Sequence, residues 1–583
     1  MPTPILRAAL ALLALAAPLA AQEADLILTD GRIWTGDSLQ PYAAAVAIRD
    51  GKFIAVGSNA QALAHRTANS RVVSLGGRFA TPGFIDNHTH FNSAGALLLG
   101  VNLLDVSDAR AFAERVKGAR DRLPADAWIT GGDWGAYEDW AANSAGATDA
   151  QRRARFSPDR GVIDSLTPRS PALLQRWDRS AYLANGAALT ASGLSCATPV
   201  EGLECLRGNA TGRVSGAALA RVRAAIPPKS FDQRLREARV ALQHLNELGV
   251  TGIHDITPRE MFPVYHELKR RGELTVRVYA RPTLDKWDEL TAVGLPHGFG
   301  DDMLRIGGLK GFVDGIQGNS TARFYEPQLH SGLRGSWRDS TNTAATSGAG
   351  SGMEPAGNML RNLDGADRAG LWPQVHAIGD EAIDTLLTLY EQVMRENPAR
   401  ERRFRIIHSQ VLRGPEVAQR YARLGVIAEV QPYHAIDDMR WMEERIGERA
   451  RWAYAFRTLH DAGVTLTFGS DWPGTNASWY TANPMQILYA AVTRETLDGS
   501  PSGGWFPQEK LDLETSLRAY TVNNAWAEGE EDRKGRVMVG FLADLTVVER
   551  DLFAIPPTQL KDVKALLTVV DGRIVYAAAP FAR

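Results

Sequence analysis

The sequence predicts an α/β protein built on a (β/α)8 barrel (TIM barrel), with a small β-sandwich domain formed from both termini and an inserted α+β subdomain. The chain has 583 residues, which is too long for one simple core. Both ends are rich in strand-like segments, whereas the middle alternates strand-like and helix-like segments. Polar residues suited to catalysis follow several of the middle strands, where a barrel of this class carries its catalytic groups.

Residues 1–21 have the features of a signal peptide. Arg7 supplies a positive charge, residues 8–17 form a short apolar run, and small residues precede a cleavage point after residue 20 or 21. The run is too short to span a bilayer, so we expect cleavage, rather than a retained anchor, and a secreted or periplasmic protein. In that oxidising location we expect the only two cysteines, Cys196 and Cys205, to form a disulfide.

Residues 22–80 and 535–583 are predicted to form one composite β-sandwich domain. Chain ends usually lie close together, and both ends of this chain have the same texture. Alternating apolar and polar residues around Asp-Gly turns are typical of β-hairpins. Such segments occur at 25–34, 44–57, 543–548 and 565–575.

Residues 81–534 are predicted to form the barrel. Most of its strand-like runs are separated by tens of residues, as crossover connections between parallel strands require. The stretch of about 101–248 is too long for one crossover and is expected to carry the inserted subdomain. Residues 339–352 are rich in Gly, Ser and Thr and form either a lid or a solvated linker. The eight runs are 83–86, 249–255, 275–280, 304–313, 372–376, 404–408, 425–431 and 463–471.

Histidines and a carboxylate collect at the ends of these strands. His88 and His90 are one residue apart, and residues at i and i+2 of a strand point to the same face. Neutral imidazole is the commonest metal ligand in proteins. Each residue alone also fits an ordinary hydrogen-bonded strand end, but together they predict a metal site. The candidate ligands are His88, His90, Lys310, His376, His408 and Asp471.

This set resembles the strand-end residues of the amidohydrolase superfamily of metal-dependent hydrolases. The resemblance is to its amidohydrolase-3 or YtcJ-like branch, and it covers nearly all of the chain after residue 21. Residues 540–548 are similar to the superfamily's returning β-sandwich strand. The other similar segments are TPGFIDNHTH at 81–90, HAIGD at 376–380, QP at 431–432 with His434 nearby, and SDWP at 470–473.

The resemblance implies a role for each candidate ligand. His88, His90 and Asp471 would hold one divalent metal ion. His376 and His408 would hold a second ion or face the substrate carbonyl. Asp471 would also take a proton from water and pass it to the leaving amine, acting first as a general base and then as an acid. In this interpretation Asp471 and His408 are the catalytic residues.

Lys310 leaves the number of ions open. An ammonium group beside a dication is unfavourable, so a plain lysine would be neutral or turned away. A carbamylated lysine (N6-carboxylysine) would instead bridge two ions through two oxygens, as in many binuclear relatives. We favour the carbamate bridge over one ion with an unmodified lysine. Imidazole with carboxylate fits zinc best, although manganese, iron and cobalt also fit.

Four further residues are candidates for substrate binding. His434 follows the seventh strand, and a solvent-exposed loop histidine is its alternative interpretation. Asp314 lies close after Lys310 at a spacing that fits the branch. Trp134 and Arg176 belong to the predicted insert, where they either line the pocket or serve a structural role.

The predicted function is that of an exported metal-dependent hydrolase that cleaves an amide, N-acyl or N-formyl C–N bond. Hydrolysis of an ester or lactone is the alternative, because the same hydroxide attacks either carbonyl. A non-catalytic binding protein is a further alternative, which missing ligands would have indicated; none of the six is missing.

Composition limits the partners of the chain. Charged residues make up 23% of the sequence and the formal net charge is −2, so no field attracts nucleic acid or an anionic membrane. We therefore expect a small-molecule substrate, no nucleic acid, and no membrane contact after signal cleavage. The oligomeric state stays open, with a homodimer among the alternatives.

Overall fold

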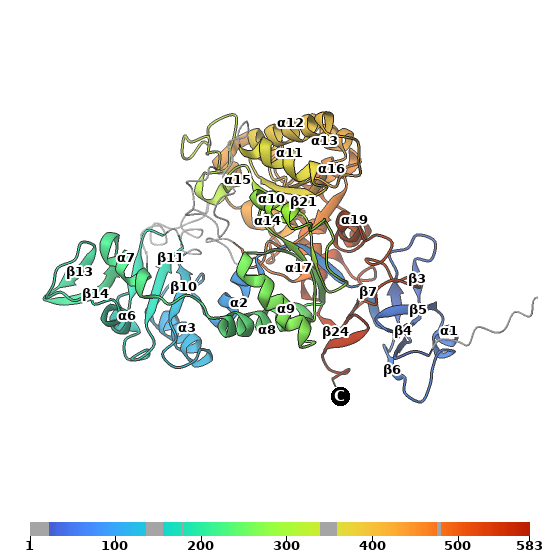
Figure 1. Cartoon of the computed structure of the whole chain (residues 1–583), viewed down its shortest axis with the longest axis horizontal. Helices are drawn as coiled ribbons and strands as arrows, with labels where there is room; N and C mark the ends of the chain where they lie inside the picture. The colour runs from blue at the N-terminus through green and yellow to red at the C-terminus, as the bar shows by residue number, and fades with distance from the viewer. Residues whose placement is uncertain (1–22, 136–155, 178, 339–357, 475–479, 583) are drawn as a thin grey trace, which may run out of the picture.

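The computed structural model describes residues 23–135, 156–177, 179–338, 358–474 and 480–582. Three regions lie side by side in Figure 1: an insert in cyan and green, a central region of parallel strands and helices, and sheets that contain the N-terminal strands in blue. The predicted signal peptide and the Gly/Ser/Thr-rich segment 339–352 lie outside the described residues.

Strands from both ends of the chain share one sheet. Its order is β25-β24-β23-β7-β2-β3, and β7 pairs antiparallel with β23. A second sheet has the order β5-β4-β1-β6. The strands are β1 (Leu26–Thr29), β2 (Arg32–Trp34), β3 (Tyr42–Ala43), β4 (Ala45–Arg49), β5 (Lys52–Gly57), β6 (Arg71–Ser74), β7 (Phe79–Pro82), β23 (Leu545–Val548), β24 (Ala565–Val570) and β25 (Arg573–Ala577).

The Asp-Gly turns predicted from the sequence join strands of these sheets. Asp50 and Gly51 connect β4 to β5 with φ angles of 48° and 73°. Asp571 and Gly572 connect β24 to β25 with φ angles of 51° and 70°. Two positive φ angles are what a type I′ hairpin turn requires, so these dipeptides set the register of the hairpins. The domain boundaries at 80 and 535 stay predictions.

The centre of the molecule contains two parallel sheets whose strands overlap all eight predicted runs. Their orders are β17-β16-β15-β8 and β18-β19-β20-β21-β22. Two isolated parallel bridges link the two sheets: Thr89 of β8 pairs with Trp472 after β22, and Thr283 after β16 pairs with Lys310 of β18. The strands are β8 (Phe84–Thr89), β15 (Val250–Ile256), β16 (Arg277–Arg281), β17 (Leu304–Ile306), β18 (Leu309–Phe312), β19 (Pro373–Ala377), β20 (Arg405–His408), β21 (Ile427–Val430) and β22 (Leu466–Phe468).

The fourth predicted run, 304–313, is divided into β17 and β18. Gly307 and Gly308 lie at the break. A Cβ atom on Gly307 would lie 2.2 Å from the Tyr279 ring, and a Cβ atom on Gly308 would lie 2.1 Å from Nε2 of Gln374. Only glycine allows this close approach, so the strand is interrupted where two large side chains of neighbouring strands enter.

Helices cover the parallel strands and connect them. The largest buried cluster joins α12, α13 and α17 to the strands through residues such as Leu386, Tyr421 and Leu488. Within the described ranges, we find no helix with the length and apolar character needed to cross a membrane. The helices of this region are α2 (Phe91–Leu99), α8 (Phe231–Glu247), α9 (Phe262–Arg270), α10 (Trp287–Ala292), α11 (Leu360–Arg368), α12 (Asp380–Glu396), α13 (Pro415–Leu424), α14 (Pro432–Asp438), α15 (Met442–Ile446), α16 (Phe456–Asp461), α17 (Pro484–Thr493), α18 (Leu513–Tyr520) and α19 (Val522–Glu528).

The insert has its own sheet, in the order β13-β14-β12-β11-β10-β9. The predicted disulfide between Cys196 and Cys205 is confirmed and joins β13 to the loop after α6. Helix α8, which the sequence placed in the insert, packs with α2 and β15 instead. The elements are β9 (Val101–Asn102), α3 (Ala109–Arg122), β10 (Ile129–Trp134), β11 (Ala172–Arg176), β12 (Tyr182–Ala184), α6 (Gly186–Ala191), β13 (Leu203–Leu206), β14 (Asn209–Val214) and α7 (Gly216–Ala225).

Candidate metal centre

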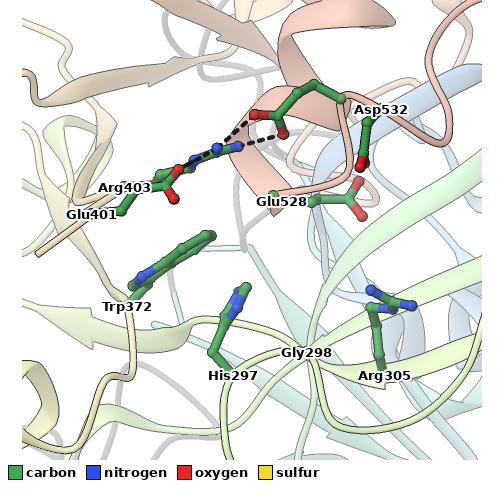
Figure 2. A pocket seen from close by; sticks show the side chains of 10 residues that line it. His297, Gly298, Arg305, Trp372, Glu401, Arg403, Glu528 and Asp532 are labelled. Atoms are coloured by element: carbon green, nitrogen blue, oxygen red, sulfur yellow. Dashed lines mark hydrogen bonds and ion pairs between the residues drawn. The ribbon is translucent and has the colours of Figure 1, made fainter. Parts of the chain in front are cut away.

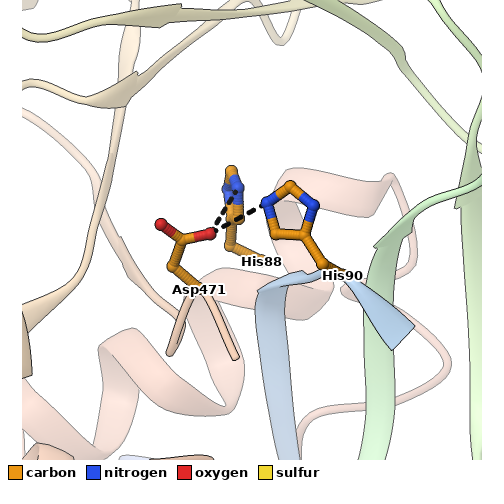
Figure 3. Close-up of side chains that lie close together, drawn as sticks. All are labelled: His88, His90 and Asp471. Atoms are coloured by element: carbon orange, nitrogen blue, oxygen red, sulfur yellow. Dashed lines mark ion pairs between the residues drawn. The ribbon is translucent and has the colours of Figure 1, made fainter. Parts of the chain in front are cut away.

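The strand β8 and the residue that follows it supply two candidate ligands at the ends of the parallel strands. His88 is buried within β8, and His90 is the residue before α2. Asp471 follows β22, and its backbone N–H donates to the carbonyl oxygen of His88 at 2.8 Å. The Nε2 atoms of His90 and His88 lie 3.0 and 3.4 Å from Oδ1 of Asp471 (Figure 3). The three residues expected to hold one ion therefore converge.

A second group of candidate ligands shares Asp471. It consists of His408 at the end of β20, His434 in α14 and Asp471, and one ligand atom from each lies within 4.8 Å of the others. Nε2 of His434 lies 3.7 Å from Oδ2 of Asp471 and has no hydrogen-bond partner among the described residues. The sequence assigned His434 to substrate binding, and the structure places it where it could also hold a metal.

Hydrogen bonds on the far side of the imidazoles determine which nitrogen is available. Nδ1 of His88 donates to Oε1 of Glu429 at 2.9 Å, and Nδ1 of His408 donates to Oε1 of Gln431 at 2.7 Å. Because a carboxylate or carbonyl oxygen can only accept, each Nδ1 carries the proton. The unprotonated Nε2 of each ring is then available to bind a metal. Metal-binding histidines commonly donate their other ring N–H to a carboxylate or carbonyl oxygen in this way.

His376 and Lys310 lie on the neighbouring strands β19 and β18. Nε2 of His376 donates to the carbonyl oxygen of Gly315 at 2.8 Å, and its ring centre lies 4.5 Å from that of His408. Nζ of Lys310 is buried with no hydrogen-bond partner among the described residues, and lies 4.5 Å from the centre of the Phe312 ring. His376 joins neither of the two ligand groups around Asp471.

Burial and nearby groups set the protonation states of these side chains to those that a cation site needs. Burial lowers the pKa of His88 well below its usual range. Burial, followed by the charge of Arg281, lowers the pKa of Lys310 well below its usual range. Burial raises the pKa of Asp471, but the hydrogen bond and charge of His90 outweigh it and the net pKa is lowered. The imidazole of His88 and the amine of Lys310 are therefore neutral, and the carboxylate of Asp471 is ionised.

This donor set fits a divalent metal ion. Neutral imidazole nitrogens and an ionised carboxylate are the ligands that zinc and similar ions prefer. His434 Nε2 and Lys310 Nζ are buried polar atoms without a partner among the described residues, and such atoms are rare in folded proteins. An ion at this position would bind the lone pairs that the side chains leave unused.

The other predicted substrate residues lie in different surroundings. Oδ2 of Asp314 accepts the backbone N–H of Gly379 at 2.9 Å, and its Oδ1 lies 3.4 Å from Nε2 of His376. Trp134 is buried in the core of the insert, where its ring meets Phe112 at 6.0 Å. Arg176 is buried in β11, opposite Trp134 in the strand register. Their assignment to substrate binding stays a prediction.

The sequence did not predict the residues that accept hydrogen bonds from Nδ1 of the two imidazoles. Glu429 and Gln431 contact His88 and His408, and Arg281 and Arg405 both contact Glu429. One signal was present, because Glu429 interrupts the otherwise apolar run Val-Ile-Ala-Glu-Val. A charged residue in the middle of a buried strand is rarely without a partner.

A family model described as the amidohydrolase family matches residues 71–576. The chain belongs to this family. The central parallel sheets and the ligands at their strand ends all lie within the matched residues. The protein is therefore a metal-dependent hydrolase of the amidohydrolase type.

Known proteins similar to this amidohydrolase cover nearly its whole length. It is 31% identical to the protein LONG AFTER FAR-RED 3 of Arabidopsis thaliana, over 95% of this chain and 92% of that protein. It is 28% identical to YtcJ of Bacillus subtilis (strain 168), over 91% and 96%. It is 25% identical to an N-substituted formamide deformylase of Arthrobacter pascens, over 95% and 99%.

A solved structure supports the same fold. An uncharacterized metal-dependent hydrolase from Pyrococcus furiosus has a TM-score of 0.68 and 26% identity, covering 90% of this amidohydrolase and 99% of the other chain.

Proposed function

We propose that this amidohydrolase hydrolyses a C–N bond of an amide, with an N-formyl or other N-acyl amine as substrate. The observation that carries the proposal is the position of Asp471, between His88 and His90 on one side and His434 on the other. The formamide-cleaving name of a 25% identical relative favours the N-formyl group among the amides.

The side chains at the strand ends have distinct tasks in this proposal. A divalent metal ion, when bound, supplies a hydroxide at neutral pH and polarises the substrate carbonyl. His88, His90 and Asp471 would hold it, with His408 and His434 facing Asp471 from the other side. Asp471 accepts the proton of the attacking water and returns it to the leaving nitrogen, which leaves as a neutral amine.

Lys310 is proposed to carry a carbamate that bridges two ions. The neutral amine is the form that reacts with carbon dioxide, and the lowered pKa of Lys310 favours it. Its buried Nζ also lacks a hydrogen-bond partner within the described part of the chain.

We propose that the two parallel sheets form one closed (β/α)8 barrel. The two bridges between the sheets, Thr89 with Trp472 and Thr283 with Lys310, support this. We further propose that the protein is exported after removal of residues 1–21, as the charge and apolar pattern of that segment predict.

The test uses purified protein and a panel of matched substrates. N-formyl amines, other N-acyl amines and the esters or lactones of the same acids are compared before and after treatment with a chelator. We expect amide hydrolysis that the chelator abolishes and added Zn²⁺ or Mn²⁺ restores. Hydrolysis of esters alone would favour the alternative function, and full activity after complete metal removal would contradict the proposal.

A further inference from the structure

A carboxylate inside the parallel sheets holds the first metal-ligand candidate in place. Glu429 lies on β21 with no exposed surface, and its Oε1 accepts from Nδ1 of His88 at 2.9 Å. The same oxygen accepts from Nη1 of Arg281 at 2.8 Å, while Oε2 accepts from Nη1 of Arg405 at 3.0 Å. Both oxygens of the carboxylate are therefore used.

The contacts continue away from the metal centre. Nη1 of Arg405 donates to Nδ1 of His254 at 2.8 Å, so His254 accepts at Nδ1 and donates from Nε2 to Glu528 Oε1 at 2.7 Å. Nη2 of Arg281 donates to the carbonyl oxygen of His254 at 3.0 Å. The direction of each hydrogen bond is unambiguous, because a guanidinium group can only donate and a carboxylate or carbonyl oxygen can only accept.

The series ends at a cleft on the side where the strands begin. Glu528 lines this cleft of about 520 Å³ together with His297 and Trp372, and Trp372 precedes the first residue of β19 (Figure 2). His88 lies at the opposite ends of the strands. Arg281 and Arg405 contact Glu429 directly and hold its carboxylate at a defined position, whereas Glu528 contacts His254 and not Glu429.

We propose that Glu429 is a positioning residue for metal binding. Its carboxylate keeps the proton of His88 on Nδ1 and the ring in one orientation, so that the lone pair of Nε2 stays available on the side of Asp471, where a metal ion would be held. A carboxylate partner also makes the imidazole a more basic ligand. The inference rests on the proposed function only through the presence of a metal ion, and it is tested by metal binding without any substrate.

A purely structural explanation makes a different prediction. Glu429 would then serve only to neutralise Arg281 and Arg405, and its loss would lower stability without changing the affinity of a folded protein for metal. The contact with His88 separates the two explanations, because no other described carboxylate contacts Nδ1 of that ring.

The experiment compares Glu429→Gln and Glu429→Asp with Glu528→Gln. Glu528 is an equally buried carboxylate of the same series that does not contact a candidate ligand, so it controls for the loss of a buried charge. Zn²⁺ affinity is measured by competition with a chromophoric chelator, and the Co²⁺-loaded proteins are compared by visible absorption. Thermal unfolding monitored by circular dichroism verifies that each variant is folded.

We expect both Glu429 variants to bind Zn²⁺ about 10- to 100-fold more weakly and to show altered Co²⁺ absorption bands. We expect Glu528→Gln to bind Zn²⁺ as the wild type does. Wild-type affinity in both Glu429 variants, or an equal loss in Glu528→Gln, would overturn the proposal.

A double variant tests the proposal if the single variants do not fold. If a Glu429 variant does not fold, the double variant Glu429→Gln/Arg405→Gln is measured in its place. This double variant leaves the net charge of the buried group unchanged. Weaker Zn²⁺ binding by this protein supports the proposal, and wild-type affinity overturns it. Because the readout is metal affinity, a protein that cleaves no amide of the panel still tests the inference.

Discussion

At the scale of single residues, Asp471 connects the two groups of histidines. Its backbone N–H is bound by the carbonyl oxygen of His88, and its φ angle is 59°, in the left-handed region. His408, at the end of β20, has a φ angle of 73°. This conformation is unfavourable for non-glycine residues and often occurs at functional sites. The backbone at these strand ends is therefore strained in the conformation that directs the two side chains inward.

Replacing Asp471 with Asn is expected to preserve the fold and to lower kcat by about 10²- to 10⁴-fold, because the proton-transferring carboxylate is lost. Steady-state kinetics on an N-formyl amine measure the effect, with circular dichroism to verify folding. Asp461→Asn, at an exposed ion pair with Arg457, serves as the control and should leave kcat unchanged. Near-normal turnover of Asp471→Asn would remove this residue from the mechanism.

Replacing Lys310 with Met is expected to lower the metal content from two ions per chain to one, because the bridging carbamate cannot form. Elemental analysis of metal-loaded protein measures this, with Lys286→Met as a surface control. A single ion per wild-type chain, together with an unmodified lysine mass, would exclude the bridge.

At the scale of elements, α14 places a second acidic group next to the site. Asp438, in the last turn of α14, accepts from Gln410 Nε2 at 2.9 Å and also from the hydroxyl of Tyr454. Burial, followed by the neighbouring charge of Asp437, raises the pKa of Asp438 to about 8. The helix is therefore held to the segment after β20 by a carboxyl group that keeps its proton at neutral pH.

The Asp438 carboxyl is expected to contribute stability that is lost as the pH rises from about 4 to about 8. A carboxyl whose pKa is raised in the folded state keeps a proton that the unfolded chain releases near pH 4, so rising pH favours unfolding across this range. The contribution is on the order of 1 kcal/mol per pH unit.

Asp438→Asn should remove this part of the pH dependence, because an amide has no proton to release. Urea unfolding midpoints at pH 5, 6 and 7 measure the slope, and Asp562→Asn, at an exposed ion pair, should leave it unchanged. An identical slope in wild type and Asp438→Asn would show that other groups cause it.

At the scale of the whole molecule, a buried ion pair joins the central strands to the terminal sheets. Arg277, at the start of β16, donates to both carboxylate oxygens of Asp544 at 2.7 and 2.9 Å. Asp544 is the residue before β23, which pairs with β7. The central strands and the terminal sheets are thus connected by a bidentate ion pair in addition to the covalent continuity of the chain.

Asp544→Asn is expected to lower the free energy of unfolding by about 3 kcal/mol, because it weakens the pairing of a buried guanidinium. Chemical denaturation measures the change. Asp551→Asn, which affects an ion pair with the half-exposed Arg32, should change stability by less than about 1 kcal/mol. Equal effects of the two substitutions would mean that the Arg277 pair adds nothing beyond a surface contact.

Patterns in the sequence were sufficient to predict that several candidate ligands lie close together. The period of two along a strand predicted that His88 and His90 lie together, and the order of strand-end residues indicated His408 and Asp471. His376, indicated in the same way, joins neither ligand group. The Asp-Gly pairs predicted hairpins, and the two cysteines predicted their own disulfide. Each of these features depends on neighbours in the chain, or on a residue type with few possible roles.

Only the tertiary structure decided which residues meet across long separations. Glu429 lies 341 positions from His88, and no local pattern indicates that their side chains share a hydrogen bond. The break between β17 and β18 likewise follows from Tyr279 and Gln374, which approach from neighbouring strands. Such contacts depend on how the strands are ordered and paired in space, and a linear pattern does not contain that information.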